Sequence, residues 1–186
     1  MRIIGGRFKG KKINFIRSSS TTPLKDSVKE NIFNILMHSN KIDIPIEGSK
    51  VLDLYSGVGS FGLECISRGS KKVSFVERNS ASYRILNDNL DKLSLLSKAE
   101  IYNQDVDSFI KIHLKKKYNI FFFDPPFANN SFIDNLKALK EKKIFEKKHI
   151  IIIHRESKTK NDFDNICRII LMRQYGRSKI FFGSFN

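Results

Sequence analysis

The chain of 186 residues is short of cysteines, long apolar runs and acidic residues. Its two cysteines, Cys65 and Cys167, are too far apart to suggest a zinc pair, and the four histidines lack metal-ligand spacing. We therefore expect a protein of a reducing cytoplasm without a structural metal. The longest apolar runs, near 120–123 and 150–153, have the length of strands and not of membrane spans. No apolar signal-peptide region follows the first residues.

The shortage of acidic residues leaves a strong positive charge. Lys and Arg number 34 against 19 Asp and Glu, which gives a net charge of +15 and a pI near 9.9. Such an excess favours a polyanionic partner, above all nucleic acid. Compositional drift is the alternative, because Lys outnumbers Arg 24 to 10. The excess is uneven, since residues 1–25 hold seven basic side chains and no acidic one, and this favours the nucleic-acid interpretation.

Residues 51–64 predict a buried strand, a glycine turn and the start of a helix. Gly57, Gly59 and Gly62 have the spacing G-x-G-x-x-G, and Glu77 lies 20 residues after Gly57. Glycines let a ligand come close to the backbone, and the helix that follows offers it free N–H groups. On spacing alone, this is the dinucleotide fingerprint of nicotinamide enzymes.

Two carboxylates favour a different ligand. Asp53 stands at the end of the first predicted strand, where its charge suits a cationic or amino-acid-bearing ligand better than the phosphates of a dinucleotide. Far downstream, the apolar strand 120–123 ends in Asp-Pro-Pro-Phe at residues 124–127. The two motifs, in this order and at two strand ends, resemble those of S-adenosylmethionine-dependent methyltransferases that modify exocyclic or amide nitrogens.

The N-terminal region narrows the resemblance. Residues 2–12, Arg-Ile-Ile-Gly-Gly-Arg-Phe-Lys-Gly-Lys-Lys, and residues 22–36 are similar to the opening of the RsmD-type 16S rRNA guanine-N2 methyltransferases. That family's pattern Arg-Pro-Thr-Thr-Asp-Arg-Val-Arg-Glu-x-Leu-Phe-Asn is matched at Pro23, Asp26, Val28, Glu30, Phe33 and Asn34, whereas Thr22, Leu24 and Lys25 replace its Arg and Thr-Thr pair. Residues 53–69 track the family's glycine motif closely, and Tyr-Gly-x-x-x-Ile follows near the C-terminus, so the resemblance covers nearly the whole chain.

Alternating strands and helices indicate a largely parallel sheet with helices on both faces. Strands are expected at 50–55, 73–77, 101–103, 118–124, 150–154, 167–174 and 179–182, and helices at 27–38, 60–68, 80–93, 106–116 and 131–141, with Asp26 as the first N-cap. The last two strands should form an antiparallel hairpin, and residues 2–15 a basic β-hairpin.

The fold class expected is therefore α/β: a Rossmann-like class I methyltransferase with a seven-stranded, largely parallel sheet, an antiparallel C-terminal strand and an N-terminal β-hairpin. One methyltransferase domain should span residues 1–186, with residues 1–25 as a basic hairpin and loop extension.

Four acids fall at the carboxyl ends of successive predicted strands: Asp53, Glu77, Asp105 and Asp124. Their separations of 24, 28 and 19 residues are one strand–helix repeat each, so the four should meet at the sheet edge where such folds bind ligands. A single strand-end carboxylate is often only a helix cap, but four in successive units favour a binding site.

The resemblance implies that S-adenosylmethionine lies across this edge. Asp53 would face its ammonium group. Glu77 would accept hydrogen bonds from two ribose hydroxyls, and Asp105 would accept one from the exocyclic amine of adenine. The expected cofactor-binding residues are Asp53, Tyr55, Gly57, Gly59, Phe61, Glu77, Arg78, Asp105 and Asp124. For Phe61, a role as the first core residue of its helix is the alternative.

The expected catalytic loop consists of Asp124, Pro125, Pro126 and Phe127. Because the methyl sulfonium is already activated, no nucleophilic side chain is needed. Asp124 and the Pro125 carbonyl would accept hydrogen bonds from the N2–H of guanine, orient the nitrogen lone pair and stabilise the developing charge. The ring of Phe127 would stack on the extruded base.

Basic residues of the N-terminal region are the expected RNA contacts: Arg7, Lys9, Lys11, Lys12, Lys25 and Lys29. The alternative is that these lysines only protect an edge strand from aggregation. The resemblance implies action on 16S rRNA in the assembled small ribosomal subunit, at position 966 in conventional numbering. We expect the protein to be a monomer. Other interpretations are an amino-methyltransferase of DNA or other RNA, a nicotinamide oxidoreductase, and a non-catalytic RNA-binding assembly protein.

Overall fold

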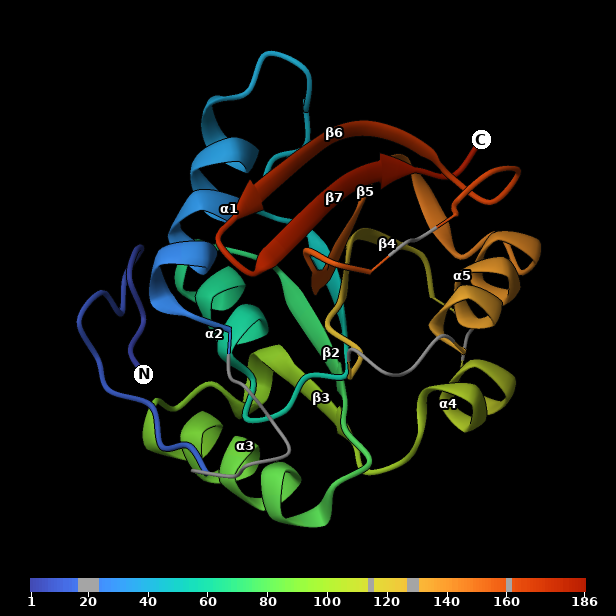
Figure 1. Ribbon diagram of the computed structural model, residues 1–186. Helices are drawn as coiled ribbons and strands as arrows, with labels where there is room; N and C mark the ends of the chain where they lie inside the picture. The colour runs from blue at the N-terminus through green and yellow to red at the C-terminus, as the bar shows by residue number, and fades with distance from the viewer. Residues whose placement is uncertain (17–23, 114–115, 127–130, 160–161) are drawn as a thin grey trace.

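The computed structural model describes residues 1–16, 24–113, 116–126, 131–159 and 162–186, and these form one seven-stranded sheet flanked by helices (Figure 1). The strands are β1 (Lys50–Leu54), β2 (Lys72–Val76), β3 (Ala99–Tyr102), β4 (Tyr118–Phe123), β5 (Phe145–Glu156), β6 (Arg168–Tyr175) and β7 (Ser178–Ser184). The helices are α1 (Asp26–His38), α2 (Ser60–Ser67), α3 (Ser80–Lys92), α4 (Val106–Ile112) and α5 (Phe132–Glu141), with a short 3-10 turn, η1, at Leu96–Lys98.

The strand order confirms the predicted fold class. It runs β3-β2-β1-β4-β5-β7-β6, and β1 to β5 pair in parallel. Strand β7 is antiparallel to β6, as the short connection around Gly176 predicts, and it is also antiparallel to β5. The order reverses between β1 and β4, which is where doubly wound sheets bind their ligands.

Helices α1, α2 and α3 cover one face of the sheet, and α4 and α5 cover the other (Figure 1). The alternation within β4 shows why: Ile120 and Phe122 belong to the core under the first three helices, and Phe121 and Phe123 to the core under the last two. A parallel strand buried on both faces needs a continuous apolar run, and this is what the sequence supplies.

Several boundaries differ from the prediction: α4 ends at Ile112 and not at 116, and β5 begins at Phe145 and not at 150. Helix α1 begins at Asp26 itself, with Lys25 at the N-cap position and no side-chain cap bond, so Asp26 is not the predicted cap. It pairs instead with Lys29 one turn later, at 3.7 Å. Strand β5 continues to Glu156, beyond the predicted end at 154, because its last residues pair with the start of β7 at Ser178.

The N-terminal segment (residues 1–16) forms a hairpin with a single bridge and no regular strands. One antiparallel bridge joins Arg2 to Lys12, and the amide of Gly10 donates to Ile3 O at 2.8 Å. The segment is not a free arm, because Ile3 is fully buried and Ile13 is 3% exposed. Its loop is fixed to the end of α2, where backbone amides bond to the carbonyl and hydroxyl oxygens of Ser67. Removing the N-terminal segment would therefore open the core.

Within the residues that the structure describes, no helix has the length and apolarity needed to cross a membrane. The same residues contain no group of three or more His, Cys, Asp and Glu side chains placed to hold a metal ion.

Candidate active site

The three glycines of the loop after β1 and the first turn of α2 (Ser60–Ser67) occupy one open position and two crowded ones. Gly57 has a φ of +54°, and a Cβ built on it would meet nothing within 4 Å. At Gly59 and Gly62, a Cβ would overlap the side chains of Leu86 and Phe75. The second and third glycines therefore allow close packing, and the first leaves a space that a ligand can enter.

Asp53 lies beneath this loop and is 1% exposed. Its Oδ2 accepts a hydrogen bond from the amide of Gly62 at 2.9 Å, which ties the strand to the helix. Its Oδ1 is buried and has no hydrogen-bond partner among the described residues. Burial raises the pKa of Asp53 well above its ordinary value, and the neighbouring charges of Asp124 and Glu77 raise it further.

Glu77 follows β2 and reaches across to the glycine loop. Its Oε2 accepts from the amide of Gly57 at 2.8 Å, and its Oε1 accepts from the amide of Asn79 at 2.7 Å. One carboxylate thus joins the loop after β1 to the start of α3. The side chain of Asn103 fixes the same corner by donating to the carbonyls of Glu77 and Arg78, at 2.9 and 3.3 Å. The predicted neighbourhood of Gly57 and Glu77 is therefore present, with the exposed Arg78 at its rim.

Asp105 is the N-cap of α4. Its carboxylate accepts from the amide and the hydroxyl of Ser108, at 2.8 and 2.9 Å, and these hydrogen bonds lower the pKa of Asp105. Capping, the alternative for a single strand-end acid, is thus realised here. The residue is exposed, so its contact with adenine stays a prediction.

Tyr55 adopts a left-handed backbone conformation, with a φ of +63°, directly after β1. Non-glycine residues in this region are uncommon and are held by their surroundings. Here the hydroxyl oxygen accepts from the Asn135 side chain of α5 at 2.8 Å. Burial raises the pKa of Tyr55 to about 12, so this anchor stays neutral.

Asp124 directly follows β4, and its side chain is 22% exposed. Its Oδ1 lies 2.8 Å from Nδ1 of His154 in β5, and Nε2 of the same ring lies 2.9 Å from Oγ of Ser178. Its backbone amide is 3.5 Å from Leu54 O, which makes the side-chain contact the tighter one. Asp124 and Asp53 thus lie on adjacent strands, and the order β2-β1-β4 places Asp53 between Glu77 and Asp124.

Arg155 is fully buried beside the two prolines. Its Nη1 lies 3.2 Å from Pro126 O and 3.5 Å from Pro125 O, and its guanidinium carbon is 4.6 Å from the centre of the Phe132 ring. Burial lowers the pKa of Arg155, while the charges of Asp124 and Tyr55 raise it. The Pro125 carbonyl, predicted to accept from the substrate, is therefore turned toward this guanidinium.

A family model described as conserved hypothetical protein 95 matches residues 1–184. The chain belongs to this family, that of the RsmD-type methyltransferases.

Two relatives and a solved structure illustrate the match. The ribosomal RNA small subunit methyltransferase D of Haemophilus influenzae is 37% identical over 132 residues, which are 70% of this chain and 65% of the relative. The candidate rRNA methyltransferase YlbH of Bacillus subtilis is 30% identical over 154 residues, 82% of this chain and 80% of the relative. The structure titled as the candidate methyltransferase yhhF of Escherichia coli has a TM-score of 0.84 at 25% identity, covering 100% of this chain and 98% of that one.

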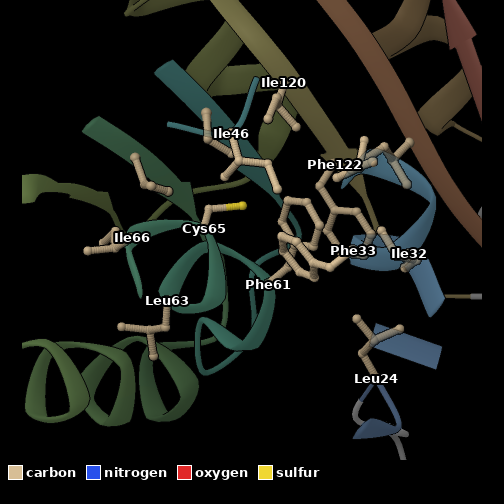
Figure 2. Close-up of a cluster of buried hydrophobic side chains, with 14 of the residues drawn as sticks. Leu24, Ile32, Phe33, Ile46, Phe61, Leu63, Cys65, Ile66, Ile120 and Phe122 are labelled. Carbon is tan, nitrogen blue, oxygen red and sulfur yellow. The ribbon is translucent and has the colours of Figure 1, made fainter. Parts of the chain in front are cut away.

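One predicted cofactor contact of this RsmD-type chain is corrected by the structure. Phe61 is 2% exposed and stacks between Phe122, at 4.0 Å between ring centres, and Phe33, at 5.2 Å (Figure 2). Its ring fills the core between α1 and the sheet, so the alternative role as a core residue holds. A large aromatic ring one residue into a helix satisfies both patterns, and only packing separates them.

Lys29 is also corrected. Its ammonium group is fully buried: Nζ donates to Arg2 O at 2.7 Å and to Ser60 Oγ at 3.1 Å, and lies 3.8 Å from Oε2 of Glu64. Burial lowers the pKa of Lys29 despite these neighbours. This lysine anchors the N-terminal segment and cannot contact RNA in this conformation. The other five expected RNA contacts, Arg7, Lys9, Lys11, Lys12 and Lys25, are exposed.

Phe127, which was predicted to stack on the base, lies outside the described residues. Two residues next to Asp124 and its loop, His154 and Arg155, were not predicted from the sequence. The signal for His154 was available, because it stands near the carboxyl end of the fifth strand just as the acids stand at the ends of their strands. For Arg155 there was none, since a cation at a strand end is ordinarily exposed.

Proposed function

We propose that this chain transfers a methyl group from S-adenosylmethionine to the exocyclic N2 of a guanine in 16S rRNA. The observation that carries the proposal is the position of Asp124: a partly exposed carboxylate at the end of β4, next to the strand that bears Asp53 and the glycine loop. Membership of a family with relatives named as rRNA small subunit methyltransferases supports the substrate class.

The described residues fit S-adenosylmethionine at three points. Asp53 Oδ1 is a buried acceptor without a partner, which is costly unless a donor meets it, and an ammonium group is such a donor. The open side of Gly57 gives room for the amino-acid part. Glu77 and Asp105 lie at the ends of the next two strands, where they would accept from ribose and adenine, and Tyr55, Gly59 and Arg78 complete the cofactor-binding set.

Bound S-adenosylmethionine supplies a methyl group already activated by its sulfonium centre. The protein must then deal with an amine whose lone pair is delocalised into the guanine ring. Asp124 accepts a hydrogen bond from N2–H, which orients the lone pair and stabilises positive charge as it develops on nitrogen. Pro125 and Pro126 lack amide hydrogens and restrict the loop, and Arg155 holds their carbonyls. Phe127 would stack on the base.

Recognition of the RNA is assigned to the exposed cations Arg7, Lys9, Lys11 and Lys12, with Lys25. Phosphate contacts of this kind supply affinity rather than base specificity. We further propose that the whole chain acts as one domain, as a monomer in the cytoplasm, and that the nucleotide is the one at position 966 in the assembled small subunit.

The decisive test uses the purified protein, S-adenosylmethionine with a labelled methyl group, and small subunits from a strain lacking this gene. Naked 16S rRNA and duplex DNA serve as parallel substrates. Label recovered as N2-methylguanosine after nuclease digestion and mass spectrometry supports the proposal.

Other outcomes select the alternatives. Label in adenine or cytosine would indicate another amino-methyltransferase. Tight RNA binding without label would indicate an assembly protein. Calorimetric binding of NAD in place of S-adenosylmethionine would indicate an oxidoreductase.

A further inference from the structure

A chain of three polar side chains runs from the proposed catalytic carboxylate to the far hairpin of the sheet. It consists of Asp124 after β4, His154 in β5 and Ser178 at the start of β7, joined at 2.8 and 2.9 Å. The histidine is 5% exposed. Its ring faces the same side of β5 as Ile152 and the opposite side from Arg155, because side chains alternate along a strand.

The hydrogen bonds have one consistent direction. An ionised carboxylate only accepts, so Nδ1 of His154 carries the hydrogen and donates to Asp124 Oδ1. In the neutral ring, Nε2 then accepts from the hydroxyl of Ser178. The carboxylate thus selects the tautomer, and the hydroxyl, which can donate or accept, satisfies the remaining ring nitrogen.

We propose that His154 is the positioning residue for Asp124, an inference that rests on the proposed function. By holding Oδ1, the ring fixes the plane of the carboxylate, and Oδ2 is directed to the amine of the substrate. Positioning is needed here because the backbone gives the carboxylate weak support. The amide of Asp124 is 3.5 Å from Leu54 O, and the two prolines that follow have no amide hydrogens to donate to the carboxylate. Small errors in the placement of a catalytic group are costly in rate.

Ser178 links this chain of hydrogen bonds to the β6–β7 connection. It is paired with Glu156 at the end of β5, and the amide of Ser157 donates to Arg177 O at 2.8 Å. The ring of His154 is thus fixed from both sides by elements that the sheet already holds.

The test compares four variants. His154→Phe removes both ring nitrogens and keeps much of the shape. His154→Asn places an amide N–H near the position of Nδ1, and Ser178→Ala removes the hydroxyl. His149→Phe is the matched control, since His149 lies on the same strand, is 9% exposed, and bonds to Phe185 N, not to the active site.

We expect kcat for His154→Phe to fall roughly 10- to 100-fold, the scale of loss when the outer hydrogen-bond partner of a metal ligand is removed. The Kd for S-adenosylmethionine and the KM for small subunits should stay within about twofold. His154→Asn should recover most of the rate, Ser178→Ala should lose less than His154→Phe, and His149→Phe should keep the wild-type kcat. A normal kcat in His154→Phe, an equal loss in His149→Phe, or a loss confined to KM overturns the inference.

A second measurement separates this inference from the proposed function. Long-range ¹H–¹⁵N spectra of the whole protein should show that the neutral ring of His154 is protonated at Nδ1. Asp124→Ala should shift the ring signals of His154 and leave those of His149 unchanged. If the wild type methylates no substrate, the proposed function fails, and these spectra still decide whether His154 holds Asp124. Unshifted His154 signals in Asp124→Ala overturn the inference in an active or an inactive protein.

Discussion

The two halves of the sheet edge hold their acids by different means. In the half formed by β1, β2 and β3, Asp53, Glu77 and Asp105 each accept from backbone amides of nearby loops and helix starts. In the half formed by β4 and β5, the contacts to Asp124 and its loop come from the side chains of His154 and Arg155. The first half is therefore fixed by chain geometry, and the second by side chains about 30 residues away.

The difference has a chemical consequence. Backbone amides hold the half formed by β1, β2 and β3, the proposed cofactor half, in a fixed shape, and Asp53 there is 1% exposed. The side chain of Asp124 is 22% exposed, so it can meet a substrate while a buried imidazole supports it from behind. Under the proposed function, the first half would bind the cofactor, and Asp124 would interact more strongly with the transition state than with the substrate.

The largest effect is expected when Asp124 is replaced, in the half formed by β4 and β5, which is the proposed catalytic half. Asp124→Ala should lower the rate of methyl transfer by roughly 100- to 1,000-fold, the scale for removing one preorganised hydrogen-bonding group from a transition state. Asp124→Asn keeps a carbonyl acceptor and should lose less. Single-turnover assays and calorimetry with S-adenosylmethionine measure the two effects. A loss of cofactor affinity as large as the loss of rate would place Asp124 in the binding half.

The next effect is expected in the cofactor half. Glu77→Ala should weaken S-adenosylmethionine binding by about 1–3 kcal/mol, the scale for a charged hydrogen-bond partner, and the amides of Gly57 and Asn79 lose their acceptor as well. The rate at saturating cofactor should change little. Glu100→Gln is the control, because this acid lies within β3 and contacts Ser74 and Lys116. Unaltered affinity in Glu77→Ala would remove Glu77 from the cofactor site.

A smaller effect is expected outside both halves. Replacing Arg7, Lys9, Lys11 and Lys12 by Gln should raise the KM for small subunits and flatten the salt dependence of RNA binding by roughly one log–log unit per lost phosphate contact. Both halves of the edge should keep their cofactor affinity and kcat. A variant with Gln at Lys142, Lys143, Lys147 and Lys148, all exposed, makes the same change in charge elsewhere. Equal salt slopes in the two variants would argue against recognition by the N-terminal segment.

The smallest effect concerns stability and pH. Burial lowers the pKa of His149, and its neutral ring accepts from Phe185 N at 2.9 Å. His149 therefore binds a proton more readily in the unfolded chain than in the folded one. The contribution of its neutral ring to folding stability is present above about pH 6.5, the ordinary pKa of histidine. This contribution is lost as the pH falls below that value. The slope is at most about 1.4 kcal/mol per pH unit. Denaturant unfolding of the wild type and His149→Phe at pH 8 and pH 5 measures it; equal pH slopes would contradict the assignment.

The sequence predicted the arrangement of the half formed by β1, β2 and β3 better than that of the half formed by β4 and β5. Gly57, Glu77 and Asp53 could be placed because a strand–turn–helix fixes its own geometry within a few residues and strand ends in a parallel sheet share one edge. Phe61 was misassigned because burial is decided by α1 and β4, which lie far from it in the chain. Lys29 was misassigned because an isolated lysine is normally exposed, and only the fold brings Glu64 and Arg2 O to its ammonium.

The sequence by itself determined the order of strands and helices, the edge at which the acids meet, and the family, since all of these follow from local periodicity and motifs. Only the tertiary structure decided which charged groups face solvent. The pairs His154–Asp124 and Lys29–Glu64 join residues 30 and 35 positions apart, and whether such groups are buried depends on the packing of several elements at once. A buried charge is tolerated only where partners converge on it, and that convergence is a property of the fold.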